Sequence, residues 1–352
     1  MRQRREGEER AMAKKDLDWG NIGFQYRQTD RRYVSNWENG EWDAGALTDD
    51  ANVVLNESAG ILQYCQQVFE GLKAYSWEDG SIVCFRPDLN AERIYASAQR
   101  IEMPPFPKER FLDAVDQVVR ANMDWVPPYG SGAALYLRPY EFATGVVIGV
   151  KPADRYQFRL FATPVGPYYK GGASPIALQV SDFDRAAPHG TGAVKAGLNY
   201  AMSLHPSVLA HEAGYAENLY LDAATRSYVE ETGGSNVIFV DKERNLVIPR
   251  SPSILPSITR RSVAYVAEHY LHLNVAERPV RFTELRDFAE CGLCGTAAVI
   301  SPVGRIAAHE ETIAFPSGME RAGEVIAALY ETLSGIQSGR IAAPEGWIRH
   351  VR

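Results

Sequence analysis

Apolar residues along the first half of the chain follow both helical and strand spacings. Over 109–124 they recur at the 3.6-residue period that places them on one face of a helix. A second helix is predicted to open at Pro87 and to run to about Arg100. Strands are predicted at 83–87, 133–142 and 156–166, where apolar residues alternate or run together. This half is therefore expected to be an α+β domain.

The second half mixes predicted strands with two long predicted helices. The strands are expected at 175–181, 216–222, 236–241 and 297–304. The helices are expected at 257–272, with Ser257 as N-cap, and at about 318–335. Turn residues are dense over 166–175, which we interpret as the connection between a domain at 17–165 and another at 176–352.

Composition narrows the classes of function. The 352 residues are 45% hydrophobic and 23% charged, which is ordinary for a globular protein with a large core. A net charge of -7 argues against nucleic acid as a partner, and no apolar run approaches the ~20 residues that span a bilayer. Residues 1–16 carry charges of both signs and are expected to be a disordered leader. Four cysteines are too few for a disulfide framework, so we expect a cytoplasmic protein.

The segment GTGAVKAGLNY (190–200) carries the most informative local pattern. A dinucleotide-binding loop fails because position 195 is lysine, and a Walker A loop fails because Gly-Lys-Ser/Thr is absent. A Tyr-x-x-x-Lys pair fails because Tyr200 follows Lys195. Two interpretations remain: a glycine turn with a solvated lysine, or a lysine that bonds covalently to an aldehyde cofactor from a partly apolar pocket.

This segment resembles the cofactor-lysine segment of class IV aminotransferases. Seven further strings match that family in order, namely VFEGLKA (68–74), FRP (85–87) with Asn90 and Arg93, LYLRP (135–139), PVGPY (164–168), ETGGSN (231–236), LPSITRR (255–261) and GTA (295–297). Together they favour the branched-chain amino-acid subgroup. The resemblance implies a two-domain α+β protein of fold type IV, with a small α/β domain and a larger pseudo-barrel domain. It also implies pyridoxal 5'-phosphate between the domains of a homodimer.

The resemblance assigns cofactor roles to individual residues. Lys195 is the catalytic residue, which bonds to the cofactor and then moves the substrate's proton as general base and acid. Tyr200 approaches the ring's 3-hydroxyl, and Glu231 keeps the pyridine nitrogen protonated, with Glu230 as the alternative if the alignment shifts by one. The phosphate is expected to be bound by Arg93, by the backbone N–H groups of Ile258 and Thr259 at a helix N-terminus, and by the hydroxyl of Thr296.

Substrate roles follow from the same resemblance. The side-chain pocket is expected to be lined by Tyr64, Phe69, Tyr136 and Tyr168, because aromatic walls suit branched aliphatic groups. Arg138 and the hydroxyl of Tyr136 are candidates to receive the second carboxylate of 2-oxoglutarate. The backbone N–H groups of Thr296 and Ala297 are expected to hold the α-carboxylate.

The expected reaction is transamination between L-branched-chain amino acids and 2-oxoglutarate. The alternatives are a D-amino-acid aminotransferase or an aminodeoxychorismate lyase on the same fold, or a non-catalytic small-molecule-binding protein. Cys291 and Cys294 precede Gly295-Thr296, whereas the family's redox pair follows that position, so a structural role is expected for them. No second Cys or His pair lies at zinc spacing, and no metal site is expected.

Overall fold

The computed structural model describes residues 14–166, 174–309 and 311–351, which form two compact units. The first contains the described chain up to 166 and again from Gln337 onward, and the second contains the described chain from 174 to Ile336. The expected leader and most of the expected connection at 166–175 lie outside the described residues.

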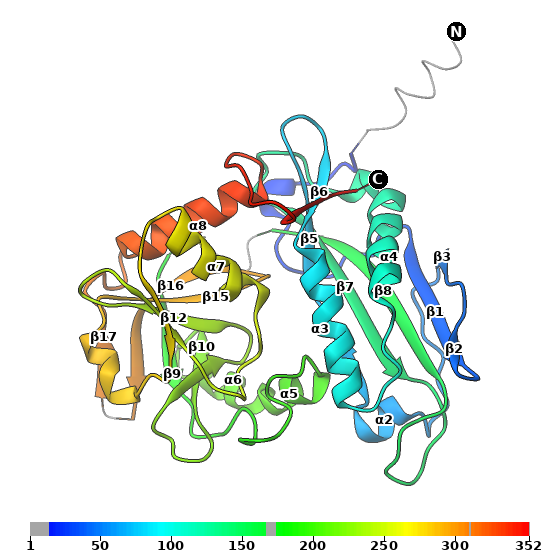
Figure 1. Cartoon of the computed structure of the whole chain (residues 1–352), viewed down its shortest axis with the longest axis horizontal. Coiled ribbons are helices and arrows are strands. Elements are labelled where there is room, and N and C mark those ends of the chain that lie inside the picture. Colours follow the sequence, from blue (N-terminus) through cyan, green and yellow to red (C-terminus); the bar gives the residue numbers. More distant parts are fainter. Residues whose placement is uncertain (1–13, 167–173, 310, 352) are drawn as a thin grey trace. The chain divides into compact units, whose positions relative to one another are not determined.

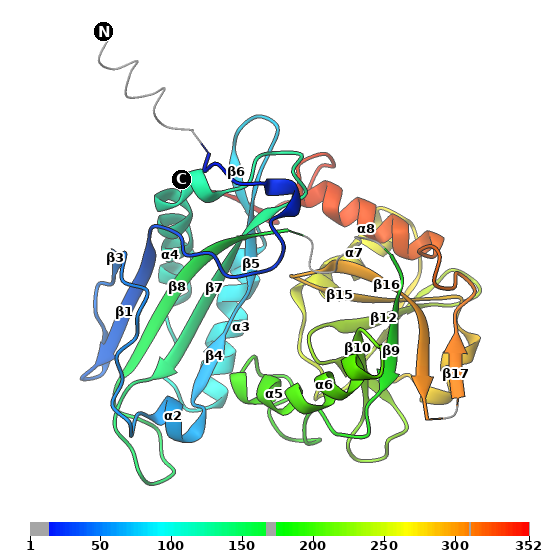
Figure 2. The ribbon, with the colours of Figure 1, turned by 180° about the vertical axis from the view of Figure 1, so that it is seen from behind.

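The first unit is a sheet with helices on one face. Its strands are β1 (Arg32–Glu38), β2 (Glu41–Trp42), β3 (Ala46–Thr48), β4 (Gln67–Phe69), β5 (Leu72–Ser76), β6 (Ile82–Phe85), β7 (Ala134–Ala143), β8 (Tyr156–Val165) and β18 (Ile348–His350). Its helices are α2 (Gly60–Tyr64), α3 (Pro87–Arg100) and α4 (Lys108–Ala121), with short 3₁₀ turns at Trp19–Asn21 and Met123–Trp125. The nine strands pair in the order β18-β6-β5-β7-β8-β1-β2, with β3 on β1 and β4 on β7. Figure 1 shows α3 and α4 in front of this sheet, and Figure 2 shows its other face.

The predicted helices and strands of this unit are confirmed. Pro87 is the first residue of α3, as its fixed φ favours. The apolar face of α4, which includes Phe111 and Val115, is fully buried. Phe106 stacks on Phe158 of β8 with ring centroids 3.9 Å apart, and this pair lies at the centre of the core between sheet and helices.

The second unit is built around a closed sheet. Its strands are β9 (Ile176–Val180), β10 (Glu217–Leu221), β11 (Val229–Thr232), β12 (Asn236–Val240), β13 (Leu246–Pro249), β14 (Val275–Arg278), β15 (Glu290–Gly295), β16 (Val299–Ala308) and β17 (Glu311–Ala314). Its helices are α5 (Gly197–Met202), α6 (Leu204–Glu212), α7 (Ile258–His269) and α8 (Glu324–Gln337), with a 3₁₀ helix at Phe282–Asp287.

The order β11-β10-β9-β16-β15-β12, together with the pairing of β12 back to β11, makes a ring of strands. Leu178, Leu219, Phe239 and Val303 are fully buried in the core of this unit. The ring confirms the expected pseudo-barrel in an α+β fold.

Two features differ from the sequence-based expectation. Helix α8 begins at Glu324 rather than near 318, because Gly318 has a φ of +62° and occupies a turn. Residues 337–352, which we expected in the larger domain, cluster with the first unit. The reason is that β18 pairs with β6 as an edge strand, where Trp347 packs edge-on against Phe85.

No helix within the described residues is both long and apolar enough to cross a membrane.

Candidate active site

Lys195 lies in the loop that precedes α5, and its amine contacts a phenol one helical turn later. Lys195 Nζ donates a hydrogen bond of 2.8 Å to Tyr200 Oη, and the same amine lies 5.1 Å from the centroid of the tyrosine ring. Both side chains are half-buried. The lysine is thus held in place at its reactive end, and the solvated-lysine interpretation does not describe it.

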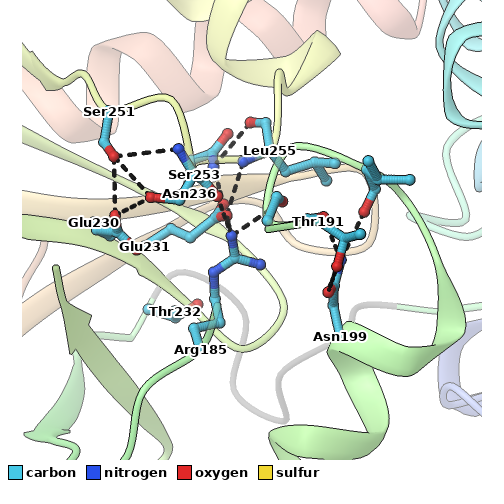
Figure 3. A network of polar contacts seen from close by, with 12 residues as sticks. Arg185, Thr191, Asn199, Glu230, Glu231, Thr232, Asn236, Ser251, Ser253 and Leu255 are labelled. Carbon is cyan, nitrogen blue, oxygen red and sulfur yellow. Dashed lines mark hydrogen bonds and ion pairs between the residues drawn. The ribbon is translucent and has the colours of Figure 1, made fainter. Parts of the chain in front are cut away.

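The amide of Asn199 braces the loop that carries the lysine. Asn199 Nδ2 donates to the carbonyl oxygens of Thr191 at 2.7 Å and Val194 at 2.8 Å. The Thr191 hydroxyl returns a hydrogen bond of 2.9 Å to Asn199 Oδ1, as Figure 3 shows. The Thr and Asn of the lysine segment therefore fix the backbone immediately before Lys195.

Glu231 on β11 is buried, and both oxygens of its carboxylate have polar partners. Its carboxylate accepts hydrogen bonds from the Leu255 N–H at 2.8 Å and from Asn236 Nδ2, and it forms an ion pair of 2.7 Å with Arg185. Burial raises the pKa of Glu231 from its ordinary value of 4.5 to about 7, and the positive charge of Arg185 opposes that shift. Sequence reasoning did not find Arg185, because its surroundings, Asp-Arg-Ala-Ala-Pro, look like an ordinary turn.

Glu230, the alternative acid, has a separate set of partners. Its carboxylate accepts hydrogen bonds from the hydroxyls of Ser251, at 2.9 Å, and Ser253. Both glutamates are almost fully buried, but successive strand residues point to opposite faces, so only one of them can face a given ligand. The two acids therefore contact different parts of the network in Figure 3.

The predicted phosphate-binding residues of this unit lie at a helix start and in a tight turn. Ile258 and Thr259 open α7, where Ser257 caps the helix by accepting a bond of 3.2 Å from the Arg260 N–H. The remaining N–H groups of a first helical turn have no partner within the helix, and they carry the positive end of its dipole. Thr296 and Ala297 lie in the turn between β15 and β16.

In the first unit, three predicted substrate residues come together. The Arg138 guanidinium lies 5.1 Å from the ring centroid of Phe69 and 5.3 Å from that of Tyr136, and it donates a bond of 3.1 Å to Tyr136 Oη. Gly71 permits this arrangement, because a Cβ there would lie 2.8 Å from Tyr136 Cζ. Tyr64 is the last residue of α2, and its hydroxyl contacts the Ile148 carbonyl. Tyr168 lies outside the described residues.

Arg93 is held by an acid that sequence reasoning left without a role. Glu70 is fully buried and receives Arg93 Nε at 2.6 Å and Nη2 at 2.8 Å, together with Asn90 Nδ2 at 2.7 Å. This two-bond ion pair joins the VFEGLKA string to the middle of α3. The available signal was a glutamate flanked by apolar residues between β4 and β5, because an acid buried there needs a partner of opposite charge.

Comparisons with known proteins identify the family of the chain. The family model described as amino-transferase class IV matches residues 67–306. A branched-chain-amino-acid aminotransferase of Haemophilus influenzae is 48% identical over 339 residues, which cover 95% of this chain and 98% of that protein. The crystal structure of the Escherichia coli branched-chain amino acid aminotransferase superposes with a TM-score of 0.77 at 28% identity, covering 92% of this chain and all of that one.

A branched-chain amino acid aminotransferase from Thermobaculum terrenum, solved in its PLP-form, gives a TM-score of 0.76 at 27% identity. That comparison covers 93% of this chain and 100% of the other. The family match spans more than half of the chain, and the bacterial relative is similar over nearly its whole length. The chain therefore belongs to the class IV aminotransferases, within the branched-chain amino-acid aminotransferase family.

Proposed function

We propose that the chain catalyses transamination between L-branched-chain amino acids (Leu, Ile, Val) and 2-oxoglutarate, giving branched 2-oxo acids and L-glutamate, with pyridoxal 5'-phosphate as cofactor. The relatives' names support this reaction. The observation that carries it is the amine of Lys195 bonded to Tyr200 in the same unit as the buried acid Glu231. A lysine and an acid so placed are the two groups that this cofactor's chemistry requires.

The residues present fit the cofactor. Lys195 offers an amine for the covalent link, Tyr200 a phenol for the 3-hydroxyl, and Glu231 a carboxylate for the ring nitrogen. In the part of the chain that the structure describes, the buried atoms Asn236 Oδ1 and Arg260 Nε have no hydrogen-bond partner, as is expected beside a polar ligand. The start of α7 supplies N–H groups for a phosphate, with Thr259 on its first turn and Thr296 as a further donor.

The bound pyridoxal ring supplies an electron sink that makes the substrate's Cα–H acidic. The chain's own residues then do the rest. With the cofactor bound, the Lys195 amine would take the proton from the substrate's Cα as general base and give it up again as general acid. Tyr200 holds that amine in position by its hydrogen bond. Glu231 keeps a proton on the ring nitrogen, because a charged acid beside that atom raises its pKa.

Substrate selection is proposed to rest on two groups of predicted residues, the aromatic side chains that line the pocket and the groups that bind the substrate's carboxylates. Phe69 and Tyr136 present aromatic surface to a branched side chain, with Tyr64 and Tyr168 as further wall residues. Arg138, already bonded to Tyr136, receives the second carboxylate of 2-oxoglutarate or glutamate. The N–H groups of Thr296 and Ala297 hold the α-carboxylate, and Arg93 contributes to the phosphate site.

We also propose that the protein is a cytoplasmic homodimer. Exposed apolar side chains on α5 and α6 support a second copy as partner, and these are Met202 (54% exposed), Leu204 (67%), Val208 (52%) and Leu209 (42%). All four cysteines are free thiols, which suits a reducing compartment. Sedimentation analysis of the purified protein should give the mass of two chains.

The test of the reaction is a steady-state panel of amino donors with 2-oxoglutarate as acceptor. L-leucine, L-isoleucine and L-valine should have the highest kcat/KM, and their D-enantiomers should be inactive. A preference for D-alanine would support a D-amino-acid aminotransferase instead. A purified protein that binds pyridoxal phosphate without the absorbance change of a lysine-linked cofactor, and without turnover of any donor, would support the non-catalytic alternative.

A further inference from the structure

Arg185 lies in the segment between β9 and α5, and its side chain reaches three separate parts of the second unit. Its Nη2 atom donates to the Gly192 carbonyl at 3.0 Å and to the Ser253 carbonyl, and pairs with Glu231 Oε1 at 2.7 Å. The arginine is almost fully buried. Figure 3 shows it beside the Glu231 carboxylate and the segment that carries Ser253 and Leu255.

These contacts join the lysine loop to the acid. Gly192 lies three residues before Lys195, and Ser253 lies two residues before Leu255, whose N–H bonds to Glu231. Only glycine fits at position 192, because a Cβ there would collide with the Ser253 carbonyl and would lie 2.9 Å from Arg185 Nη2. The close approach of loop, arginine and carbonyl is therefore built into the sequence.

The charges around Glu231 leave Arg185 as its principal counterion. Burial raises the pKa of this acid, and Arg185 is the largest of the groups that lower it, ahead of the more weakly acting Arg260. Glu230, the next residue on β11, acts in the opposite direction. Burial raises the pKa of the Cys294 thiol on β15 to about 12, and the negative charge of Glu231 acts in the same direction. Cys294 is therefore neutral and contributes no charge near Glu231.

We propose that Arg185 is a positioning residue, which keeps the Glu231 carboxylate charged and oriented and ties it to the loop that presents Lys195. The inference rests on the roles proposed above for Lys195 and Glu231. Arg185 does not touch the reacting atoms in this scheme. All three acceptors, two carbonyl oxygens and a carboxylate, meet at one guanidinium nitrogen, Nη2. The guanidinium is planar and always charged, so it supplies a permanent positive charge at that point.

The experiment compares Arg185→Met and Arg185→Lys with the wild type. The matched control is Arg286→Met, which breaks an exposed arginine–glutamate pair with Glu311 at the same distance of 2.7 Å. The first readout is the titration of Glu231 in the cofactor-free protein, followed by carboxylate infrared absorption and assigned by subtracting the spectrum of Glu231→Gln. Arg185→Met should raise the titration midpoint by about one pH unit or more, Arg185→Lys should raise it less, and Arg286→Met should leave it unchanged.

The second readout is the pH profile of kcat at saturating cofactor. Groups that orient a ligand-holding carboxylate at metal sites are typically worth about 10- to 100-fold, so kcat of Arg185→Met should fall by at least that lower factor, with partial recovery in Arg185→Lys. An unchanged Glu231 midpoint in both Arg185 variants overturns the proposal, even if activity falls. If Arg185→Met does not fold, Arg185→Lys alone decides by the same midpoint.

Failure of the underlying function has a different signature. In that case Lys195→Ala and Glu231→Gln would retain wild-type turnover, whatever the Arg185 variants do. A shifted Glu231 midpoint together with such unaffected Lys195 and Glu231 variants would support the electrostatic link and refute the proposed reaction.

Discussion

At the scale of single residues, the two best-defined polar contacts have different functions. The bond from Lys195 to Tyr200 holds a half-buried amine whose chemistry we propose as the catalytic step. The ion pair of Arg93 with Glu70 lies within the first unit, where the Glu70 side chain is fully buried and that of Arg93 is 10% exposed. Substitution should therefore affect turnover in the first case and folding in the second.

Lys195→Ala should abolish turnover and the absorbance band of lysine-bound cofactor near the visible range. The variant loses both the covalent link and the proton carrier, so the loss should exceed the ~10²–10⁴-fold typical of a general base alone. Steady-state assays and absorbance spectra check this, with the exposed Lys242→Ala as control. Wild-type activity in Lys195→Ala would refute the assignment of the catalytic residue.

Arg93→Ala should destabilise the cofactor-free protein by about 3–5 kcal/mol, because it leaves the buried Glu70 charge without its partner. Urea unfolding of the cofactor-free protein measures this free energy, with Arg100→Ala at the exposed end of α3 as control. Titration with cofactor then tests the phosphate role separately, as an increase in Kd.

A double variant, Arg93→Ala with Glu70→Gln, separates the contributions further. It should be more stable than Arg93→Ala alone, since the unpaired charge has been removed. Full stability of Arg93→Ala would contradict the cost expected for leaving this buried side chain without its partner. An unchanged Kd would leave Arg93 with a purely structural role.

At the scale of elements, α5 is too short to fix the preceding loop by helical structure alone. It spans six residues, and the loop geometry depends instead on the amide of Asn199. Strand β15 differs, because its six residues are held by backbone hydrogen bonds to the strands on both sides and not by a side chain. Variants in α5 and in β15 should therefore differ in their effect on activity.

Asn199→Ala should lower kcat while the protein remains folded. The substitution removes the donor from two carbonyls, of Thr191 and Val194, at a cost of roughly 1–3 kcal/mol for each buried group left unsatisfied, and it frees the loop that presents Lys195. Rate measurements at saturating cofactor and circular dichroism check this, with the exposed Asn52→Ala as control. Equal kcat in both variants would show that the lysine does not depend on this brace.

The Cys291 and Cys294 pair on β15 should not regulate activity. Both thiols are buried, and burial raises the pKa of Cys294 to about 12 and that of Cys291 well above its ordinary 9.0, so the reactive thiolate is not formed. Mild peroxide treatment followed by assay with and without reductant is the test. A Cys65→Ser background removes the exposed thiol. Reversible inactivation in that background, lost in Cys294→Ser, would show a redox switch.

At the scale of the whole molecule, stability should depend on pH through a buried acid that the proposed chemistry does not use. Glu141 on β7 is fully buried, and burial raises its pKa well above the ordinary 4.5, opposed only by the backbone N–H of Phe106. Because the pKa of Glu141 is higher in the folded than in the unfolded state, protonated Glu141 contributes to the free energy of unfolding. This contribution is fully present below pH 4.5 and is lost as pH rises through the pKa of the folded state.

Glu141→Gln should therefore gain stability over the wild type as pH rises. The difference should grow by about 1.4 kcal/mol for each pH unit until the folded pKa is reached, or roughly 2–4 °C in Tm. Thermal unfolding of both proteins from pH 5 to pH 9 measures it, with the exposed Glu78→Gln as control. A constant Tm difference across that range would contradict a neutral Glu141.

The sequence predicts those parts of the fold that carry a local signal. Helices α3 and α7 are predicted because Pro87 and Ser257 mark their starts. Seven strands are predicted from alternating or continuous apolar residues, namely β6, β7, β8, β9, β10, β12 and β16, whereas others such as β1, β11 and β15 are not. Short helices α5 and α6 were missed, since they lack a clear apolar face and Pro206 interrupts the pattern. The lysine loop needed the family resemblance to be interpreted.

Arg185 shows why the remainder of the site was not predictable. Its three acceptors come from segments as far as 68 residues away, and no local spacing records such a contact. The same reason explains the last strand, because the pairing of β18 with β6 joins positions that are more than 250 residues apart.

That last strand also sets the order in which the protein can be completed. The sheet of the first unit gains its edge strand, and Arg349 reaches Asp116 at 2.7 Å, only when residues 348–350 have been synthesised. At about 5–20 residues per second, the whole second unit takes roughly 10 to 30 s to emerge before then. During that interval the outer edge of β6 has no partner strand in the ribosome-bound chain. The first unit is therefore made first, but its sheet is completed last.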